Sequence, residues 1–408
     1  MKIHKTIFVM LMCLSYSIGY SQDVKYIYIK DIPSDTKKYL ADFEEVSNNV
    51  NKQYTHLKDK NIDGISLQSK YLALVGTAKT NLEYGDILLR YFAELKNGHS
   101  SAIFKKYYKN CGAILIENQV FLSYVDDSVF IKTGIKEKDE ILKINNIPVL
   151  DYIQNQAKYT TASTALHRTY LTVSGLFSSY YEEDRTYTIK TSTGEKNITV
   201  HFVDEPPVQT ANTKPASKIE SKVLNENVGY ISILGMTGNV VEDFISAYEA
   251  LLKKPFLIID IRRNQGGNSG YAEKITEYLI TKDQTASVSN RQLKPKSNNY
   301  HGKLFVLTSP YTFSAGESFA LDLLESGNAS LVGMPTGGDT GNQPRFYNSK
   351  LGYSYWFPSR NQAQISKAGF PMEGRSIEPQ YKISRTIADY FNGDDTILNF
   401  TLNLISEK

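Results

Sequence analysis

Short apolar segments alternate with amphipathic ones over residues 228–333, and this alternation limits the chain to few architectures. Four segments are rich in β-branched and aromatic residues, as buried strands are: 228–234, 256–261, 304–308 and 330–333. Apolar residues recur at helical spacing in three segments between and after them: 241–251, 269–280 and 314–324. A chain that alternates strands with helices forms a sheet on which the helices pack. The sequence therefore predicts an α/β core in residues 227–408, the largest domain and the expected seat of chemistry.

The composition excludes several classes of protein. The 408 residues include 46 Lys and Arg against 43 Asp and Glu, and 41% of them are hydrophobic. This much apolar material can bury a core, and a net charge of +3 is not the basic excess that nucleic-acid binding needs. Two cysteines cannot form a disulfide framework or a four-thiolate zinc site. We predict no cofactor, no metal and no nucleic-acid partner.

The N-terminus has the pattern of a secretory signal. Basic residues precede an apolar run at 7–18, and small residues follow before Gln22. This run is too short to span a membrane comfortably but suits a signal peptide. We predict a signal peptide at 1–21, cleaved after Ser21, and a periplasmic or secreted protein with no later membrane span. A lipid anchor at Cys13 is less favoured, and Cys111, the remaining cysteine, is expected to be a small buried hydrophobe.

Helical periodicity dominates residues 22–105, which we predict to be a helical N-terminal domain. Apolar residues recur every three or four positions in three segments, which predict helices at 34–57, 71–82 and 87–95. Asn97 and Gly98 suit the end of the third helix, so His99 is expected on the loop that follows. Residues 206–226 contain three prolines and little periodicity, and we predict that they are a linker.

Residues 106–205 contain short β-like segments, and one stretch among them resembles a known domain. The sequence TGIKEKDEILKINNIPV at 133–149 is similar to the core signature of PDZ domains, in which a strand ends in an Asn-centred turn. PDZ domains bind extended peptides at a sheet edge and capture a terminal carboxylate with backbone amides. The resemblance implies a PDZ-like β domain with these peptide-binding residues: Gly112, Ala113, Ile114 and Leu115. The alternative is an ordinary β-hairpin region.

Two loops of the α/β core contain residues suited to chemistry. The strand at 256–261 runs into a polar loop with Gly266 and Gly267, whose backbone can turn sharply and present its amides to an oxyanion. The strand at 304–308 is followed by Ser314 in the segment SAGE, where a hydroxyl can sit at the positive end of a helix. Taken alone, Ser314 and Glu317 are better explained as a helix capping box.

A serine nucleophile also needs a base and a group that orients the base, and neither has to be near it in sequence. His99, in the segment LKNGHS, is the candidate base, because the other five histidines lie in the signal or in contexts that suit a structural role. Glu373, in the segment PMEGRSIEP, is the candidate orienting acid. Glu378 lies five residues later and is its alternative.

The order and spacing of these segments resemble the tail-specific, or C-terminal processing, serine proteases and their relatives, the tricorn core peptidase and interphotoreceptor retinoid-binding protein. In members with a Ser-Lys dyad the lysine follows the serine by twenty-five residues, and Asp339 stands at that position here. An aspartate cannot supply the amine, so the similarity is to the tricorn branch, which uses histidine and glutamate. The resemblance implies a multidomain α+β and α/β fold with a ClpP/crotonase-like core of mixed sheet.

The resemblance also implies a role for each candidate residue. Ser314 attacks a peptide carbonyl, His99 accepts its proton, and Glu373 orients the imidazole directly or through another hydroxyl. Three backbone amides are the expected oxyanion donors: those of Gly266, Gly267 and Ala315. Because the helical domain supplies His99 and the α/β core supplies Ser314, the site is expected at the interface of the two.

The implied function is that of an exported serine endopeptidase with a PDZ-like domain for docking or gating. Its expected substrates are peptides or unfolded proteins, which it would recognise through free C-termini. One alternative is a catalytically silent relative that binds a peptide or another ligand. A second is a scaffolding protein in which the PDZ-like domain does the binding. The sequence leaves the physiological substrate and the oligomeric state open.

Overall fold

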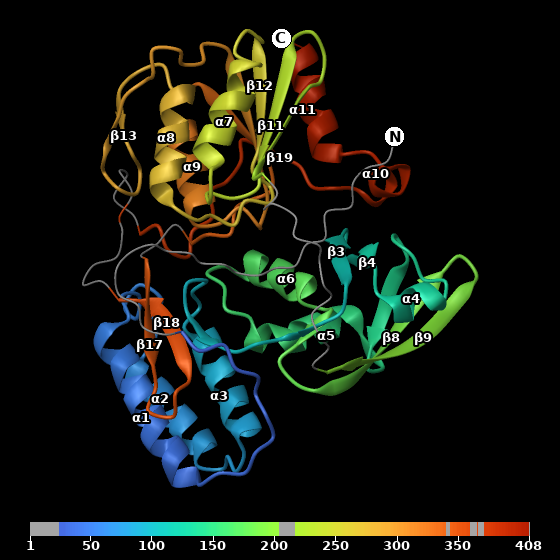
Figure 1. Ribbon diagram of the computed structural model, residues 1–408, viewed down its shortest axis with the longest axis vertical. Coiled ribbons are helices and arrows are strands. Elements are labelled where there is room, and N and C mark those ends of the chain that lie inside the picture. Colours follow the sequence, from blue (N-terminus) through green and yellow to red (C-terminus); the bar gives the residue numbers. More distant parts are fainter. Residues whose placement is uncertain (1–23, 204–216, 340–342, 360–364, 366–370, 408) are drawn as a thin grey trace.

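The computed structural model describes residues 24–203, 217–339, 343–359, 365 and 371–407. The chain is a mixed α+β protein with several sheets, divided among a helical bundle, a middle β region and an α/β core (Figure 1). The predicted signal peptide and part of the predicted linker lie outside the described residues. Within those residues, no helix combines the length and the apolar character that a membrane crossing requires.

Three helices form the N-terminal bundle: α1 (Thr36–Gln53), α2 (Gly64–Val75) and α3 (Asn81–Glu94). Each begins after a residue whose side chain accepts a hydrogen bond from the first turn: Asp35, Asp63 and Thr80. The predicted helix at 71–82 is wrong in its bounds, because α2 ends at Val75 and a cap at Thr80 starts α3. The apolar spacing there runs across a turn between two helices.

Strands from the C-terminal half complete this bundle. Strand β1 (Ser101–Ile103) pairs with β18 (Ser354–Pro358), which pairs with β17 (Pro344–Asn348). Tyr355 and Phe357 of β18 are buried in the same apolar cluster as the helices. Residues 344–358, expected in the α/β core, therefore pack on the bundle, because their aromatic side chains need an apolar face that the helices present.

The middle region is built on one antiparallel sheet with the strand order β3-β4-β5-β8-β9, in which β6 also pairs with β5. Its strands are β3 (Cys111–Ile116), β4 (Gln119–Val125), β5 (Glu140–Ile144), β6 (Ile147–Pro148), β8 (Glu183–Thr191) and β9 (Gly194–Phe202). Its helices are α4 (Ser128–Lys132), α5 (Val149–Gln156), η1 (Ala157–Tyr159) and α6 (Ala165–Ser174), and a small pair joins β2 (Tyr107–Tyr108) to β7 (Ser178–Ser179). Asn145 and Asn146 both adopt positive φ in the turn between β5 and β6, as a tight hairpin requires. Cys111 is buried, as predicted.

The α/β core is a six-stranded mixed sheet with the order β10-β11-β12-β15-β16-β19. The strands are β10 (Ile219–Val223), β11 (Val228–Ile233), β12 (Phe256–Asp260), β15 (Lys303–Thr308), β16 (Ala329–Gly333) and β19 (Tyr381–Lys382). Strand β10 is antiparallel to β11 and the other neighbours are parallel. The four predicted strands are confirmed, whereas the predicted linker at 206–226 is wrong over 219–223, which form the edge strand β10.

Helices cover both faces of this sheet (Figure 1). One face carries α7 (Val240–Glu249), α8 (Ser269–Leu279) and α9 (Ala315–Glu325), and the other carries α11 (Thr396–Ser406). The remaining elements are peripheral: β13 (Gln284–Thr285), β14 (Gln292–Leu293) and α10 (Ile387–Asn392). Because β12, β15 and β16 are parallel, their carboxyl ends lie at one edge of the sheet, and the loops that follow them meet there.

A partly buried charge cluster fastens α11 to the sheet. Arg262, just after β12, donates from its two terminal nitrogens to Asp395 at 2.8 and 2.7 Å and from Nε to Asp260 at 3.0 Å. Asp395 is also the N-terminal cap of α11. The two carboxylates therefore share one guanidinium that joins the helix to the end of a central strand.

Replacing Arg262 with Met should destabilise the protein by about 2–4 kcal/mol, because it leaves two partly buried carboxylates without their cation. The measurement is the midpoint of urea unfolding. Arg291→Met is the control, since Arg291 pairs with Glu273 and Glu277 but its side chain is 45% exposed. That substitution should cost less than about 1 kcal/mol. Equal losses in the two variants would contradict the assignment.

Candidate active site

Ser314 lies at the start of α9, in the loop that leaves the carboxyl end of β15. Its φ is 55°, a left-handed conformation that a residue with a side chain seldom adopts. Such strain is typical of a turn that aims a nucleophile out of a sheet. The loop after β12 holds this turn in place, because Phe313 N–H donates to the Asn264 carbonyl at 3.0 Å.

His99 lies beside Ser314 although 215 residues separate them in sequence. Its Nε2 is 3.1 Å from Ser314 Oγ, and its ring packs on Phe313 at 4.8 Å between ring centres. The preceding Gly98 N–H donates to Ser163 Oγ at 3.0 Å, which fixes the loop against the middle region. Ser314 and His99, predicted from distant motifs, are thus brought within hydrogen-bonding distance.

The carboxylate that contacts His99 is Asp339. Its Oδ1 lies 2.8 Å from His99 Nδ1, and its side chain is fully buried. From sequence, Asp339 stands out only as the residue that replaces a dyad lysine, and its contact with His99 is not apparent. The available signal was its position one step after the Thr336-Gly337-Gly338 segment, in a loop that follows a strand parallel to that of Ser314.

Glu373 lies behind Asp339 and does not occupy the position next to the ring, so of the two routes predicted for it, direct contact with His99 or contact through another hydroxyl, the direct one is not found. Its backbone forms an isolated bridge with Asp339, and the two carboxyl groups lie close enough for each to shift the pKa of the other. Its Oε1 is 2.5 Å from Lys60 Nζ. The alternative, Glu378, has a half-exposed side chain that pairs with Lys382 at 2.7 Å.

The charges of these groups depend on one another. Burial lowers the pKa of His99, but the Asp339 carboxylate outweighs burial and leaves that pKa above 6.5. Burial also raises the pKa of Asp339, and His99 more than offsets this, so its pKa lies well below the usual range. The pKa of Glu373 is raised by burial and by Asp339, against the opposing effect of Lys60. Two neighbouring carboxyl groups shift the pKa of one another, because two like charges at short range are unfavourable.

Glu317 connects the nucleophile to the loop that contains Asp339. Its carboxylate accepts hydrogen bonds from Ser314 N–H at 3.1 Å, Thr336 Oγ1 at 2.6 Å, Gly338 N–H at 2.7 Å and Asp339 N–H at 2.8 Å. The capping box predicted for Ser314 and Glu317 is present. Burial raises the pKa of Glu317 to about 7, although the donors oppose this. A capping motif alone did not reveal the contacts with the later loop.

The two loop glycines let backbone approach Ser314 closely. Gly266 and Gly267 have φ of 93° and 133°, and a Cβ on Gly266 would lie 2.7 Å from the Ser314 Cβ. Gly266 N–H already donates to Asn264 Oδ1 at 2.9 Å, so this amide is engaged within its own loop. Gly266 and Ala315, two of the three predicted oxyanion donors, adjoin each other beside Ser314.

The predicted peptide-binding residues Gly112, Ala113, Ile114 and Leu115 lie on β3, an edge strand of the middle sheet that packs against α6. They do not contact Ser314, but the start of α6 reaches the active-site loops. Thr164 Oγ1 donates to the Gly337 carbonyl at 2.9 Å. The candidate site is thus bordered by all three regions, and not only by the two that were expected.

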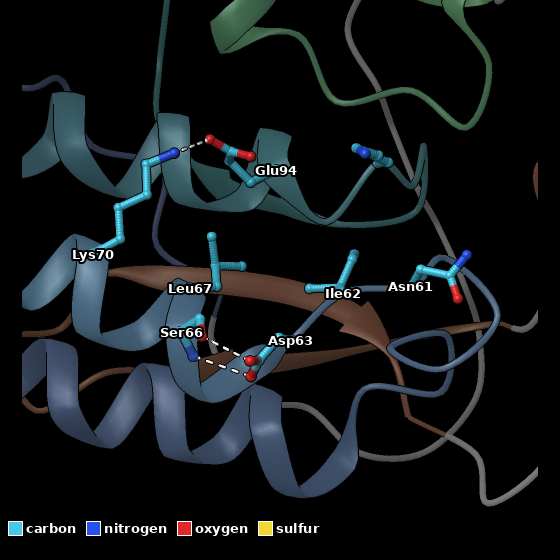
Figure 2. Close-up of a pocket in the computed structure, with 8 residues that line it drawn as sticks. Asn61, Ile62, Asp63, Ser66, Leu67, Lys70 and Glu94 are labelled. Atoms are coloured by element: carbon cyan, nitrogen blue, oxygen red, sulfur yellow. Dashed lines mark hydrogen bonds and ion pairs between the residues drawn. The ribbon is translucent and has the colours of Figure 1, made fainter.

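A metal cluster or a separate pocket would be a second candidate site in the described part of the chain. No group of three His, Cys, Asp or Glu side chains there could hold a metal ion. A pocket of about 300 Å³ opens on the helical bundle, lined by Asn61, Ile62, Asp63, Ser66, Leu67, Lys70, Glu94 and Lys96. Figure 2 shows two interactions among these side chains: Lys70 pairs with Glu94 at 2.6 Å, and Ser66 Oγ donates to Asp63. Neither Ser314 nor His99 lines it.

Three family profiles match the chain in succession. Residues 35–93 match the Tricorn protease C1 domain, and residues 115–203 match the N-terminal domain of the Bacteroidetes S41 peptidase family. Residues 227–383, which contain the loops of Ser314, Asp339 and Glu373, match Peptidase family S41. The chain belongs to peptidase family S41.

Named relatives of this S41 chain are similar over part of its length. It is 36% identical over 123 residues to carboxy-terminal processing protease CtpB of Bacillus subtilis, which is 28% of this chain and 26% of the relative. It is 27% identical over 192 residues to the tricorn protease of Thermoplasma acidophilum, 44% of this chain and 17% of the relative. CtpA of Bacillus subtilis is 25% identical over 287 residues, 64% of this chain and 55% of the relative. The chain thus spans about half or less of the length of these relatives.

A solved structure shares the fold of this S41 chain. Mature CPAF superposes with a TM-score of 0.72 at 14% identity, over 87% of this chain and 94% of that one. The tricorn protease structure gives a TM-score of 0.51 at 19% identity, over 91% of this chain and 37% of that one. The arrangement of helical, β and α/β regions is therefore that of known S41 structures.

Glu317→Gln should change how stability depends on pH. The pKa of about 7 in the folded protein exceeds the ordinary value of 4.5, so the folded state binds the proton more tightly. The contribution of Glu317 to the free energy of unfolding therefore falls as pH rises from 4.5 to about 7, by at most about 3 kcal/mol. Urea midpoints at several pH values should show this fall in the wild type beyond that of the variant. Parallel curves would contradict the assignment.

Proposed function

We propose that this S41 chain is an exported serine endopeptidase that cleaves peptide or unfolded protein substrates with Ser314 as the nucleophile. One observation carries the proposal: Ser314 Oγ lies 3.1 Å from His99 Nε2, and the other ring nitrogen lies 2.8 Å from the buried Asp339 carboxylate. This order of hydroxyl, imidazole and carboxylate is the one that activates a serine. The family match supports the same reaction class. Export rests on the signal-like pattern at residues 1–21 alone.

Each step of acyl transfer has a residue to perform it. Ser314 Oγ attacks the substrate carbonyl while His99 Nε2 takes the hydroxyl proton, and the negative charge of Asp339 stabilises the imidazolium that forms. The backbone N–H of Ala315 and the glycine loop at 266–267 are the proposed donors to the tetrahedral oxyanion. His99 then protonates the departing amine, and the same residue later activates the water that releases the acyl group from Ser314.

We assign the orienting role to Asp339 and a supporting role to Glu373. Asp339 is the carboxylate at ion-pair distance from the imidazole, so it sets the tautomer and the orientation of the ring. Glu373 lies beside Asp339, whose charge raises its pKa, and is one residue further from the reacting atoms. The resemblance implies that Ser314, His99 and Glu373 act together. We propose instead that Ser314 contacts His99, that His99 contacts Asp339, and that Glu373 supports Asp339 from behind.

The middle region is the proposed docking site for substrate ends. Strand β3 is the edge of its sheet, and an extended peptide can add to such an edge. The names of CtpA and CtpB as carboxy-terminal processing proteases support substrates presented by a free C-terminus. The link from Thr164 to the Gly337 carbonyl would let a peptide held beside α6 influence the loop of Asp339.

Labelling with a fluorophosphonate probe tests the nucleophile and its base. Wild-type protein should be labelled, whereas Ser314→Ala and His99→Ala should not. Absence of labelling in the wild type, with or without added peptide, would favour a catalytically silent ligand-binding relative.

Rates of peptide hydrolysis distinguish the role of Asp339 from that of Glu373. Asp339→Asn should lower kcat/KM by roughly a thousand- to ten-thousandfold, because an amide orients the imidazole wrongly. Glu373→Gln should cost about ten- to a hundredfold, as for groups one contact removed from a functional site. A larger loss at Glu373 than at Asp339 would reverse the assignment.

Fluorescence anisotropy of labelled peptides on Ser314→Ala protein tests docking. A peptide with a free apolar C-terminus should bind at least about tenfold more tightly than its C-terminal amide, since the amide lacks the charge that backbone N–H groups capture. Equal affinities would argue against carboxylate capture. Hydrolysis of the same peptide by the wild type only would exclude a purely scaffolding role.

A further inference from the structure

A lysine from the helical bundle reaches the acid pair behind His99. Lys60 lies in the turns between α1 and α2, and its Nζ is 2.5 Å from Glu373 Oε1. The side chain of Lys60 is 9% exposed and that of Glu373 is 1% exposed. An ion pair this deeply buried contributes little net stability compared with apolar packing. The main effect of this ion pair is to place a positive charge beside the carboxyl groups of Glu373 and Asp339.

Lys60 also holds the segment that leads to His99. Its ammonium donates to the carbonyl of Lys96, three residues before the histidine. One side chain therefore contacts both the backbone before the base and the carboxyl group two contacts behind it. A change in the position of Lys60 is transmitted to His99 by both routes.

We infer that Lys60 is a positioning residue for the base of the proposed peptidase, holding Glu373 and fixing the charge of the Asp339–Glu373 pair that faces His99. The inference rests on the proposed function. Lys60 touches no reacting atom, so its effect is on the orientation and the protonation of His99. The helical bundle thereby supplies both the base and the cation that adjusts it.

The other groups around the acid pair come from several elements. On the bundle side they are Tyr54 and His56, both buried. From the middle region Ser163 contacts Asp339, and His167 lies close enough to feel its charge. From the α/β core Glu317 lies close enough to add its charge. Burial lowers the pKa of His56 and takes that of His167 to about 4, whereas the Lys60 side chain lies at ion-pair distance from Glu373.

The sign of the effect follows from Coulomb's law. The positive charge of Lys60 opposes the gain of a second positive charge at His99. Removing it makes the protonated imidazole easier to form, which raises the pKa of His99. Because the base must be neutral to accept the Ser314 proton, activity would then be lost at a higher pH as the solution is acidified.

The experiment is the pH profile of kcat/KM for a fluorogenic peptide, with active sites counted by fluorophosphonate labelling. Lys60→Met should move the acid limb upward by about half a pH unit or more and lower kcat. Lys60→Arg keeps the positive charge, so the acid limb of its pH profile should lie at the same pH as in the wild type. Lys70→Met is the matched control, since Lys70 pairs with the bundle residue Glu94 in the pocket of Figure 2 and its side chain is 57% exposed. It should leave both quantities unchanged.

The outcomes separate the two proposals. A merely structural role would reduce the count of active sites without moving the acid limb, and an unmoved limb in Lys60→Met would overturn the inference. If Lys60→Met does not fold, the double variant Lys60→Met/Glu373→Gln takes its place, because it leaves no buried Glu373 charge without a partner. It is compared with Glu373→Gln alone. The acid limb of Glu373→Gln should lie at the lower pH, because that variant keeps the positive charge of Lys60. Coincident limbs in that pair would equally overturn it. Absence of labelling and hydrolysis in the wild type would instead reject the proposed function.

Discussion

The buried carboxylate of Glu317 is the interaction on which the geometry of the site depends. It accepts hydrogen bonds from the backbone of Ser314 and from three groups of the loop at 336–339. A group with several acceptor positions can join segments that share no secondary structure, which a backbone ladder cannot do. Two loops from adjacent parallel strands are thereby fixed at one edge of the sheet, and the positions of the serine and of Asp339 become mutually dependent.

The second constraint is that no single region contains the whole arrangement. The bundle contributes His99 and Lys60, the α/β core contributes Ser314 and both carboxyl groups, and the start of α6 closes on Gly337 from the middle region. Each contact is short and at least partly buried, so small rigid-body movements of one region would lengthen hydrogen bonds in the site. The geometry of the site therefore depends on how all three regions pack against one another.

The sequence was sufficient for elements whose signal is local, and insufficient where contacts join distant segments. The strands at 228–333 and the Asn145-Asn146 turn followed from periodicity and turn chemistry, and Ser314 and His99 from motifs. Asp339 was missed because its significance lies in a contact with a residue 240 positions earlier. The edge strand at 219–223 was missed because four of its five residues are exposed, and polar residues there look like a linker. The break between α2 and α3 was missed because apolar spacing continued through it.

The bundle that carries His99 includes strands made late in the chain. Tyr353, Tyr355 and Phe357 are part of its apolar core, and Leu351 N–H donates to Asp42 of α1 at 2.6 Å. A nascent chain that lacks residues 344–358 exposes the aromatic face of its first helices and lacks part of the core beside the loop of His99. That loop therefore settles only after almost the whole polypeptide has been made.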